Sequence, residues 1–350
     1  MKKIMVVGNF AKDSFATHIF ETLIDMNYEA LSYSVVPNTY DYNNYLTYIL
    51  KKSYRHAFSI LNNLYFYRKK RLNPLLKVLK TKQPDLIIVT HDFFWPIEIT
   101  RIKSNFNGII ILWFPDAITN FGKGFFLISD YDFLFFKDPF IVRKLRKVTT
   151  KPVFYLPECF NPKRHFFDKK KEIRREFISD LNCVGNFHSW RSLFFEKLSK
   201  YDFKFFGINP PNWMNIGSLT IHFQGFPVFN ETKAEAFLGA KIVLNNLHYG
   251  EIWGLNARAF EIAGVGAFQL IDYTDGLNEL FEDGKEIISF KGVDDMIRKI
   301  DYWLLHENER NEIGKAAKLR SYNEHTYEIR LNTLINTVFN NEHGFNSKLL

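Results

Sequence analysis

The stretch Lys241–Asp272, KIVLNNLHYGEIWGLNARAFEIAGVGAFQLID, decides the fold of this chain. Its hydrophobic pattern predicts a strand over Lys241–Asn245, a polar loop to Gly254, a helix over Leu255–Ala263 and a strand over Ala267–Ile271. Two glycines after the helix end it. A loop that follows the carboxyl end of a strand and leads into a helix N-terminus is where open α/β sheets bind nucleotides.

This loop and helix carry side chains suited to a nucleotide. Arg258 and Glu261 are three residues apart, so they share a helix face and form either an ion pair with each other or a binding site. As a binding site, Arg258 would meet phosphate and Glu261 would accept hydrogen bonds from the ribose hydroxyls, since a carboxylate offers several acceptor positions. Asn256, at the helix start, either caps the helix or binds a sugar.

Short apolar runs alternate with longer segments along the rest of the chain, which is typical of parallel sheets covered on both faces. The predicted strands of the first half are Lys3–Val7, Glu29–Val36, Asp85–Thr90, Gly108–Phe114, Tyr131–Phe136 and Val153–Leu156. Those of the second half, besides the two above, are Asn182–Val184, Phe203–Phe206, Leu219–Phe223 and Glu286–Phe290. The fold class is therefore α/β, with two Rossmann-like domains, 1–160 and 161–350, and a helical C-terminal tail. The basic, proline-containing segment 161–175 is the expected linker.

Three glycines follow predicted strands of the second half: Gly185, Gly207 and Gly225. Together they indicate a sheet edge kept bare so that a nucleotide can lie close to the backbone. Arg191 comes one short turn after Gly185 and Asn186, where it is either a surface arginine or a bidentate partner of a diphosphate.

Acidic residues follow three strands of the first half: Asp92, Asp116 and Asp138. Each is either a helix cap or a functional carboxylate at the active edge of the sheet. Gly8 ends the first strand and permits close approach there, by a ligand or by packing.

The composition excludes several classes of protein. The chain has 350 residues, long enough for two cores, and 46% of them are hydrophobic. It lacks a zinc-protease HExxH, a phosphate-binding P-loop, a GxSxG elbow and a GxGxxG motif, which argues against common NTPases, hydrolases and dehydrogenases. The two cysteines have no metal-like spacing, and neither a secretory leader nor a membrane-spanning run is present. We therefore expect a cytoplasmic protein with no metal site.

Positive charge is concentrated in one segment. The net charge is +8, and residues 51–84 contain ten lysines and arginines and no acid. This segment is either a solvated pair of basic helices or a surface for acidic lipid or a phosphorylated substrate. No nucleic-acid-binding motif accompanies the charge, so nucleic acid is not an expected partner.

The second half resembles a known family. The pieces that carry the resemblance are LPECFNP (156–162), VGNFHSWR (184–191), ARAFEIAGVGAFQLIDYTDGLNELFEDGKEIISFKGVDDMIRKIDYWL (257–304) and ENERNEIGKAAKLRSYNEHTYEIR (307–330). Their order and spacing resemble the spore-maturation, CgeB-type family of glycosyltransferase-like proteins over roughly residues 150–335. The first half matches mainly in WFPDA (113–117).

That family is similar to the GT-B glycosyltransferases. The resemblance implies two Rossmann-like domains facing across a cleft, a nucleotide-sugar donor held by the second and no essential metal. It puts the donor diphosphate against Gly185, Arg191 and Arg258, and the ribose on Glu261. In related retaining enzymes a second glutamate lies eight residues before that one, whereas Glu251 lies ten before it, so retaining or inverting chemistry stays open.

The acceptor, a cell-envelope glycan or a lipid-linked sugar, is then expected at the first domain. An inverting enzyme needs a base there, and Asp92 or Asp116, beside His91, is the candidate. The basic segment 51–84 would bring the protein to the inner face of the membrane. Two alternatives stay open: a sugar-nucleotide epimerase on the same fold, which needs only the donor, and a non-catalytic scaffold, which binds no nucleotide.

Overall fold

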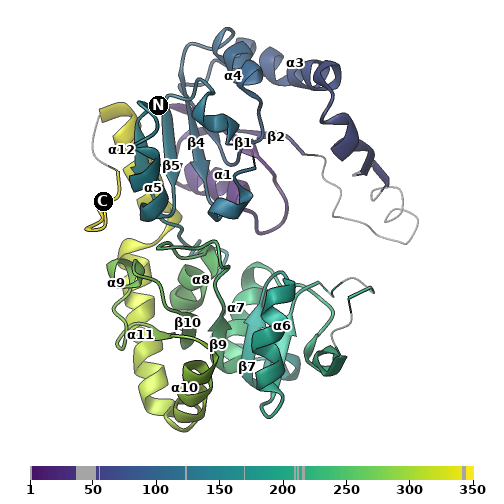
Figure 1. Ribbon diagram of the computed structural model, residues 1–350. Coiled ribbons are helices and arrows are strands. Elements are labelled where there is room, and N and C mark those ends of the chain that lie inside the picture. The colour runs from purple at the N-terminus through teal and green to yellow at the C-terminus, as the bar shows by residue number, and fades with distance from the viewer. Residues whose placement is uncertain are drawn as a thin grey trace. The chain divides into compact units, whose positions relative to one another are not determined.

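The computed structural model describes residues 2–36, 53–54, 56–122, 124–168, 170–208, 210, 213–214, 217–340 and 344–350. The chain forms two compact units, each built on its own sheet (Figure 1). The first unit contains Met1–Lys137, Ile141–Leu156 and Leu331–Asn346, and the second contains Asp138–Phe140, Pro157–Arg330 and Ser347–Leu350. The segment from Leu331 thus packs with the first unit, although it follows the second in sequence.

The first unit is a six-stranded parallel sheet with the order β2-β1-β3-β4-β5-β6. Its strands are β1 (Lys3–Gly8), β2 (Glu29–Ser34), β3 (Leu86–Val89), β4 (Ile109–Phe114), β5 (Phe133–Phe136) and β6 (Val153–Tyr155). Its helices are α1 (Phe15–Asp25), α3 (Tyr65–Lys82), α4 (Pro96–Lys103) and most of α5 (Pro139–Leu145), with the 3₁₀ helices η1 (Ile118–Asn120) and η2 (Phe125–Leu127). The central strands β3 (LIIV) and β4 (IIILWF) are almost wholly buried, as a parallel sheet covered on both faces requires.

The second unit is a five-stranded parallel sheet with the order β11-β10-β9-β7-β8. Its strands are β7 (Ser179–Val184), β8 (Phe203–Phe206), β9 (Ala240–Asn245), β10 (Gln269–Asp272) and β11 (Ile288–Phe290). Its helices are α6 (Ser189–Phe195), α7 (Asn230–Gly239), α8 (Ala257–Val265), α9 (Leu277–Leu280), α10 (Val293–Leu305), α11 (Glu307–Glu324) and the start of α12 (Tyr327–Asn340). Short 3₁₀ helices occur at η3 (Arg175–Phe177), η4 (Glu196–Leu198) and η5 (Gly217–His222).

Each face of the second sheet has its own core. Leu181 and Leu244 pack with apolar side chains of α6 and α10, whereas Val184 and Val243 pack with those of α7 and α8. Because successive strand residues point to opposite faces, continuous apolar runs are what both cores need. In Figure 1, α10 and α11 lie side by side in this unit, and α3 and α4 do so in the first.

Two predictions about the second half are wrong. Leu219–Phe223 was expected to be a strand, but most of it lies in the 3₁₀ helix η5, and only Phe223 makes an isolated bridge, to Phe205. Leu219 is buried while Ile221 is exposed, so the apolar run covers one side of a tight turn instead of filling a sheet. The expected linker is not free either, because Asn161, His165 and Phe167 are buried within the second unit.

Within the basic segment 51–84, Tyr65–Lys82 forms the helix α3, and residues 51, 52 and 55 lie outside the described part of the chain. No helix in the described ranges is both long enough and apolar enough to cross a bilayer.

Candidate functional site

The carboxyl ends of β7, β9 and β10 form one edge of the second sheet, because the three strands are parallel neighbours. Gly185 follows β7 with a φ of +132°, a conformation that side-chain-bearing residues rarely adopt. A Cβ atom built on it would lie 2.4 Å from Nη2 of Arg258, in the first turn of α8. The missing side chain at Gly185 therefore makes room for the Arg258 guanidinium.

Arg258 is held at this edge by the end of β9. Its Nη1 donates to Oδ1 of Asn245 at 3.2 Å, and Asn245 in turn donates to Gln269 at 2.8 Å. Asn256 caps α8, because its Oδ1 accepts from the Ala259 backbone amide at 3.1 Å, and its side-chain amide also bonds to Asn245. Of the two readings of Asn256, the structure bears out the cap.

Arg191, the second arginine at this edge, is only 4% exposed. Its Nη1 donates to the Asn186 carbonyl at 2.6 Å and its Nη2 to the Asn246 carbonyl at 3.1 Å. Arg191 is therefore not a surface arginine, which was one of the two interpretations of the sequence. Burial, and then the charge of Arg258, lower the pKa of Arg191 to about 10. We call Arg191 and Arg258 the arginine pair. Neither has a carboxylate within ion-pair distance among the described residues.

Other titratable groups at the same edge respond to the arginine pair. Burial raises the pKa of Asp272 to about 7, although the Leu247 amide and the charge of Arg191 oppose the shift. His188 has its pKa lowered by burial and then by Arg191, His248 and Arg258. The edge thus carries concentrated positive charge in partly buried surroundings, where an anion would be bound strongly.

Glu261 is 8% exposed and does not pair with Arg258. Its two carboxylate oxygens each lie 3.1 Å from Nζ of Lys233 in α7, and its Oε1 lies 3.5 Å from Nε2 of His165. The ion pair between Arg258 and Glu261, one of the two interpretations of their spacing, is therefore absent. Glu261 contacts Lys233 and His165, whereas Arg258 contacts Asn245.

The other predicted glycines are structural in different ways. A Cβ on Gly207 would lie 2.2 Å from the Gly185 carbonyl oxygen, so Gly207 allows the ends of β7 and β8 to approach. Gly225 has a φ of +80° but follows η5, so the expectation that it ends a strand is wrong. Asn186 is exposed, and its backbone carbonyl anchors Arg191.

The first unit has a pocket of about 290 Å³, which we call the first-unit pocket. His91 and Asp92, directly after β3, line it. Burial raises the pKa of Asp92 to about 6, against the charges of His91 and Arg68, and Asp92 Oδ1 is buried without a hydrogen-bond partner in the described ranges. Asp92 therefore has the environment of a general base.

Asp116, after β4, is engaged with His91. Nε2 of His91 lies 3.4 Å from Oδ2 of Asp116. Burial raises the pKa of Asp116, but the hydrogen bond from His91 and the charge of Lys137 outweigh it, so the pKa lies below its usual value. A carboxylate of lowered pKa is the weaker base, so of the two candidates Asp92 is favoured.

Gly8 is explained by packing. A Cβ there would lie 2.4 Å from Oγ1 of Thr90 and 2.6 Å from Cβ of Ala16. The glycine therefore lets α1 and β3 close onto β1, and no ligand is needed to explain it.

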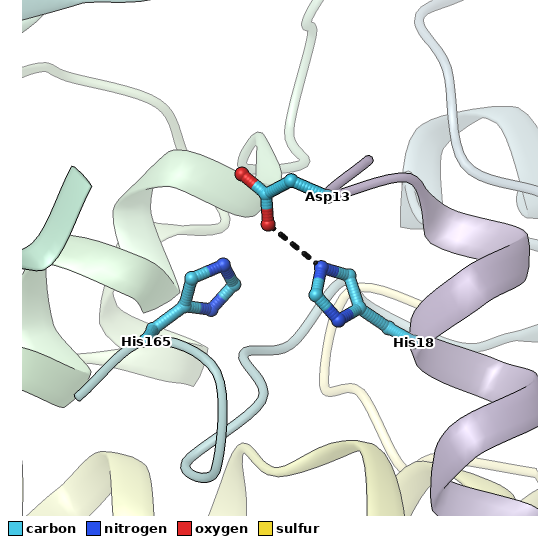
Figure 2. Close-up of side chains that lie close together, drawn as sticks. All are labelled: Asp13, His18 and His165. Carbon is cyan, nitrogen blue, oxygen red and sulfur yellow. Dashed lines mark hydrogen bonds and ion pairs between the residues drawn. The ribbon is translucent and has the colours of Figure 1, made fainter. Parts of the chain in front are cut away.

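Sequence reasoning did not identify Asp13 and His18, which lie after β1. Nε2 of His18 lies 2.9 Å from Oδ1 of Asp13, and both side chains are almost fully buried (Figure 2). Figure 2 also draws His165, which belongs to the second unit and contacts Glu261 as described above. The spacing of five residues between Asp13 and His18 matches no helical pair, so the sequence carries no signal for this contact.

Four other residues of the second unit were not singled out: Lys233, Asn245, Asn246 and His248. Asn245 and Asn246 could have been identified from the sequence. Two consecutive side-chain amides at the end of an apolar strand do not serve apolar packing, and buried amides require hydrogen-bond partners. Lys233 lies on a helix 28 residues before Glu261, and no local pattern links them.

Part of this chain matches a known protein family, and solved structures share its fold. Residues 191–336 match the family described as glycosyl transferase-like. A search of curated protein sequences gives no match. Among solved structures, the sucrose-phosphate synthase of Thermosynechococcus elongatus is similar at a TM-score of 0.67 and 11% identity, covering 97% of this chain and 100% of that one.

Two further structures show the same fold. HepE from Anabaena, solved in complex with UDP-glucose, is similar at a TM-score of 0.67 and 9% identity, over 96% of this chain and 99% of that one. A Listeria monocytogenes protein described as a UDP-N-acetylglucosamine 2-epimerase is similar at a TM-score of 0.57 and 11% identity, over 99% and 100%.

The chain thus has the GT-B fold, built from two parallel α/β sheets, and its residues 191–336 match a glycosyl transferase-like family. This confirms the predicted fold class, and the family match supports the predicted enzyme class. The CgeB-type subfamily is the finer part of the resemblance, and it stays a prediction.

Proposed function

We propose that the protein transfers a sugar from a nucleotide-sugar donor to a glycan or lipid-linked acceptor. The observation that carries the proposal is the arginine pair at the carboxyl edge of the second sheet. Two guanidiniums close enough to depress a pKa, without a carboxylate at ion-pair distance in the described residues, are costly unless an anion binds them. A sugar-linked diphosphate supplies that anion, and a known neighbour of the same fold binds UDP-glucose.

The arginine pair would do two things in the reaction. Before transfer, Arg191 and Arg258 would hold the diphosphate through charge-assisted hydrogen bonds. During transfer, the bond from the sugar's anomeric carbon to the diphosphate oxygen breaks, and the same charges stabilise the nucleoside diphosphate as it leaves. We propose that this replaces a metal ion, so that the enzyme works with none bound.

Glu261 would accept hydrogen bonds from the ribose hydroxyls. Its contacts with Lys233 and His165 support this assignment, because partners on other parts of the chain fix the orientation of the carboxylate. Asn186 and the backbone after β7 and β8, at Gly185 and Gly207, would lie nearest the nucleotide.

The test is nucleotide binding by titration calorimetry with UDP, GDP, TDP and CMP, with and without EDTA. We expect one diphosphate to bind equally well in both conditions. Arg258→Ala should weaken its binding about 10- to 100-fold, because a hydrogen bond to a charged group contributes about 1.5–3 kcal/mol. Arg298→Ala, which removes an exposed arginine of α10, is the matched control and should leave the affinity unchanged.

Two results would contradict this proposal: absence of binding by every nucleotide, which is what a scaffold predicts, or equal affinity for the Arg258→Ala and wild-type proteins. Loss of binding in EDTA alone would overturn metal independence. The epimerase alternative is separated by incubating the enzyme with the donor alone, since only an epimerase then releases an isomerised nucleotide sugar.

The acceptor would bind the first unit, with Asp92 or Asp116 as base and His91 beside them. The enzyme would work at the cytoplasmic face of the membrane, where the basic helix α3 meets anionic lipid. Exposed apolar side chains in α3 and in the residues before it support that contact: Tyr54, Ile60, Leu61, Leu64, Tyr65 and Phe66.

A further inference from the structure

The first-unit pocket contains two arginines from successive turns of α3, and they differ in one respect. Arg68 is neutralised: its Nε donates to Oε2 of Glu98 at 3.0 Å, its Nη2 donates to the Phe93 carbonyl at 2.8 Å, and its guanidinium lies over the Trp95 ring. Glu98 has no other basic partner among the described residues. The charge of Arg68 is therefore balanced by Glu98, and no bound anion is needed to explain its burial.

Arg71 is not neutralised. Its Nη1 donates to the Val35 carbonyl at 2.7 Å, and it lies over the Phe58 ring, but it has no ion pair in the described part of the chain. Burial, and then the charge of Arg68, lower the pKa of Arg71. A guanidinium carries five N–H donors in a planar fork, so most of them remain available on a pocket wall.

The remaining wall of the pocket complements this charge. Aromatic rings from three segments line it, among them Phe58, Trp95 and Phe121, and Asp92, whose Oδ1 has no hydrogen-bond partner in the described residues, also lines it. A volume near 290 Å³ is at the small end of ligand pockets, which suits one ring with one charged group.

We propose that this pocket takes the acceptor as a phosphorylated sugar, with the phosphate on Arg71, the ring against the aromatic wall and a hydroxyl toward Asp92. The inference rests on the proposed function and names the acceptor class for it. Asp92 accepts the proton of the attacking hydroxyl when transfer occurs. The phosphate belongs either to a free sugar phosphate or to a sugar linked to a lipid through phosphate.

The test compares binding of glucose, glucose 1-phosphate and glucose 6-phosphate by titration calorimetry in the presence of saturating UDP. The lipid arm uses a polyprenyl-phosphate-linked sugar in neutral detergent micelles. We expect at least one phosphorylated ligand to bind ten-fold or more tightly than glucose. Arg71→Ala should abolish that preference, whereas Arg143→Ala, an exposed arginine of the same unit, should retain it.

The outcomes separate the two proposals. Equal affinity for phosphorylated and neutral sugars, or a preference that survives in Arg71→Ala, overturns the acceptor inference while UDP binding leaves the proposed function standing. Absence of binding by all four nucleotides in the wild-type protein overturns the proposed function instead. A preference for the micellar ligand over both soluble phosphates assigns the lipid-linked source.

A second measurement does not depend on the variant folding. Phenylglyoxal modifies accessible arginines, and mass spectrometry reads each peptide separately. In the wild-type protein, the preferred sugar phosphate should protect Arg71 and leave Arg143 fully reactive. Equal modification of Arg71 with and without the ligand would reject the assignment.

Discussion

Asp92 shows how one residue can set the pH dependence of the reaction. Its pKa is raised to about 6 by burial, and a general base acts only when deprotonated. We therefore expect kcat/KM to rise as pH increases through about 6 and to level off above it. Asp92→Asn should lower kcat about 100- to 10,000-fold and leave UDP affinity unchanged, measured by initial rates and calorimetry.

Asp130→Asn is the control for this prediction, since Asp130 is an exposed carboxylate of the same unit. A variant of Asp92 with near-normal kcat, or a wild-type profile that is flat between pH 5 and 8, would assign the base to Asp116 or to a retaining mechanism without a protein base.

Gly185 tests the link between a backbone position and the arginine pair. In Gly185→Ala the new Cβ would meet Arg258 and the φ of +132° would be strained, so we expect weaker UDP binding and a loss of about 1–3 kcal/mol of stability. Gly284→Ala is the matched control: its φ is also positive, at +90°, but nothing lies within 4 Å of the new Cβ. It should lose stability and keep its UDP affinity. Calorimetry and thermal unfolding measure both quantities, and equal UDP affinities for the two variants would contradict the argument.

At this scale, spacing predicts neighbours only within one element. Gly185, Arg191 and Arg258 could be placed together because each follows the carboxyl end of a parallel strand or begins the helix after it. The Lys233–Glu261 contact and the absence of an ion pair at Arg71 in the described residues could not be predicted, because side-chain pairs between elements depend on packing that one sequence does not reveal. Arg68 and Arg71 look alike in the sequence, and only the structure shows that Glu98 neutralises one of them.

At the scale of elements, α8 and α11 approach closely because both have glycine at the contact. A Cβ on Gly314 would lie 2.4 Å from the Gly266 carbonyl oxygen, which is backbone and cannot rotate away. Alanine would otherwise favour the helix by about 1 kcal/mol over glycine. We expect the clash to dominate, so that Gly314→Ala lowers the free energy of unfolding by about 1–3 kcal/mol in urea denaturation.

Asn311→Ala in the same helix is the control, and we expect it to change the free energy of unfolding in the opposite direction. Asn311 is exposed, so only the helix propensity changes and the variant should be slightly more stable than wild type. If Gly314→Ala is also stabilised, α8 and α11 move apart easily and the glycine contact is not a constraint.

Most helices and strands could be predicted from the sequence, because their apolar runs are longer than the uncertainty in where each element begins and ends. The stretch Lys241–Asp272 forms β9, α8 and β10 within a few residues of the expected bounds. Leu219–Phe223 failed because five residues with two β-branched side chains suit a strand or a buried turn equally well, and the contacts that decide between them lie elsewhere in the sequence.

At the scale of the whole molecule, the proposed membrane contact depends on positive charge: the net charge is +8, and residues 51–84 contain ten basic residues and no acid. We expect the protein to sediment with vesicles of anionic phospholipid and not with neutral ones, and high salt should release it. Replacing the exposed Lys70 and Lys77 together with glutamate should weaken vesicle binding at least ten-fold, since each basic residue contributes about 1 kcal/mol.

Lys315→Glu is the control, because Lys315 is equally exposed but belongs to the second unit. Equal binding to neutral vesicles, or binding that the double replacement leaves intact, would show that the basic helix is only a solvated surface.

The helix α12 has a consequence for anyone who divides this chain. Its first residues belong to the second unit, whereas the helix from Leu331 onward belongs to the first. There its apolar side chains are buried: Leu331, Leu334, Ile335 and Val338. The rest of the first unit ends near residue 156, far earlier in the sequence. A fragment cut at that point would leave its apolar stripe unfilled and would be prone to aggregate. A chimera that exchanges the first unit between relatives must therefore carry residues 331–346 together with the N-terminal part of that unit.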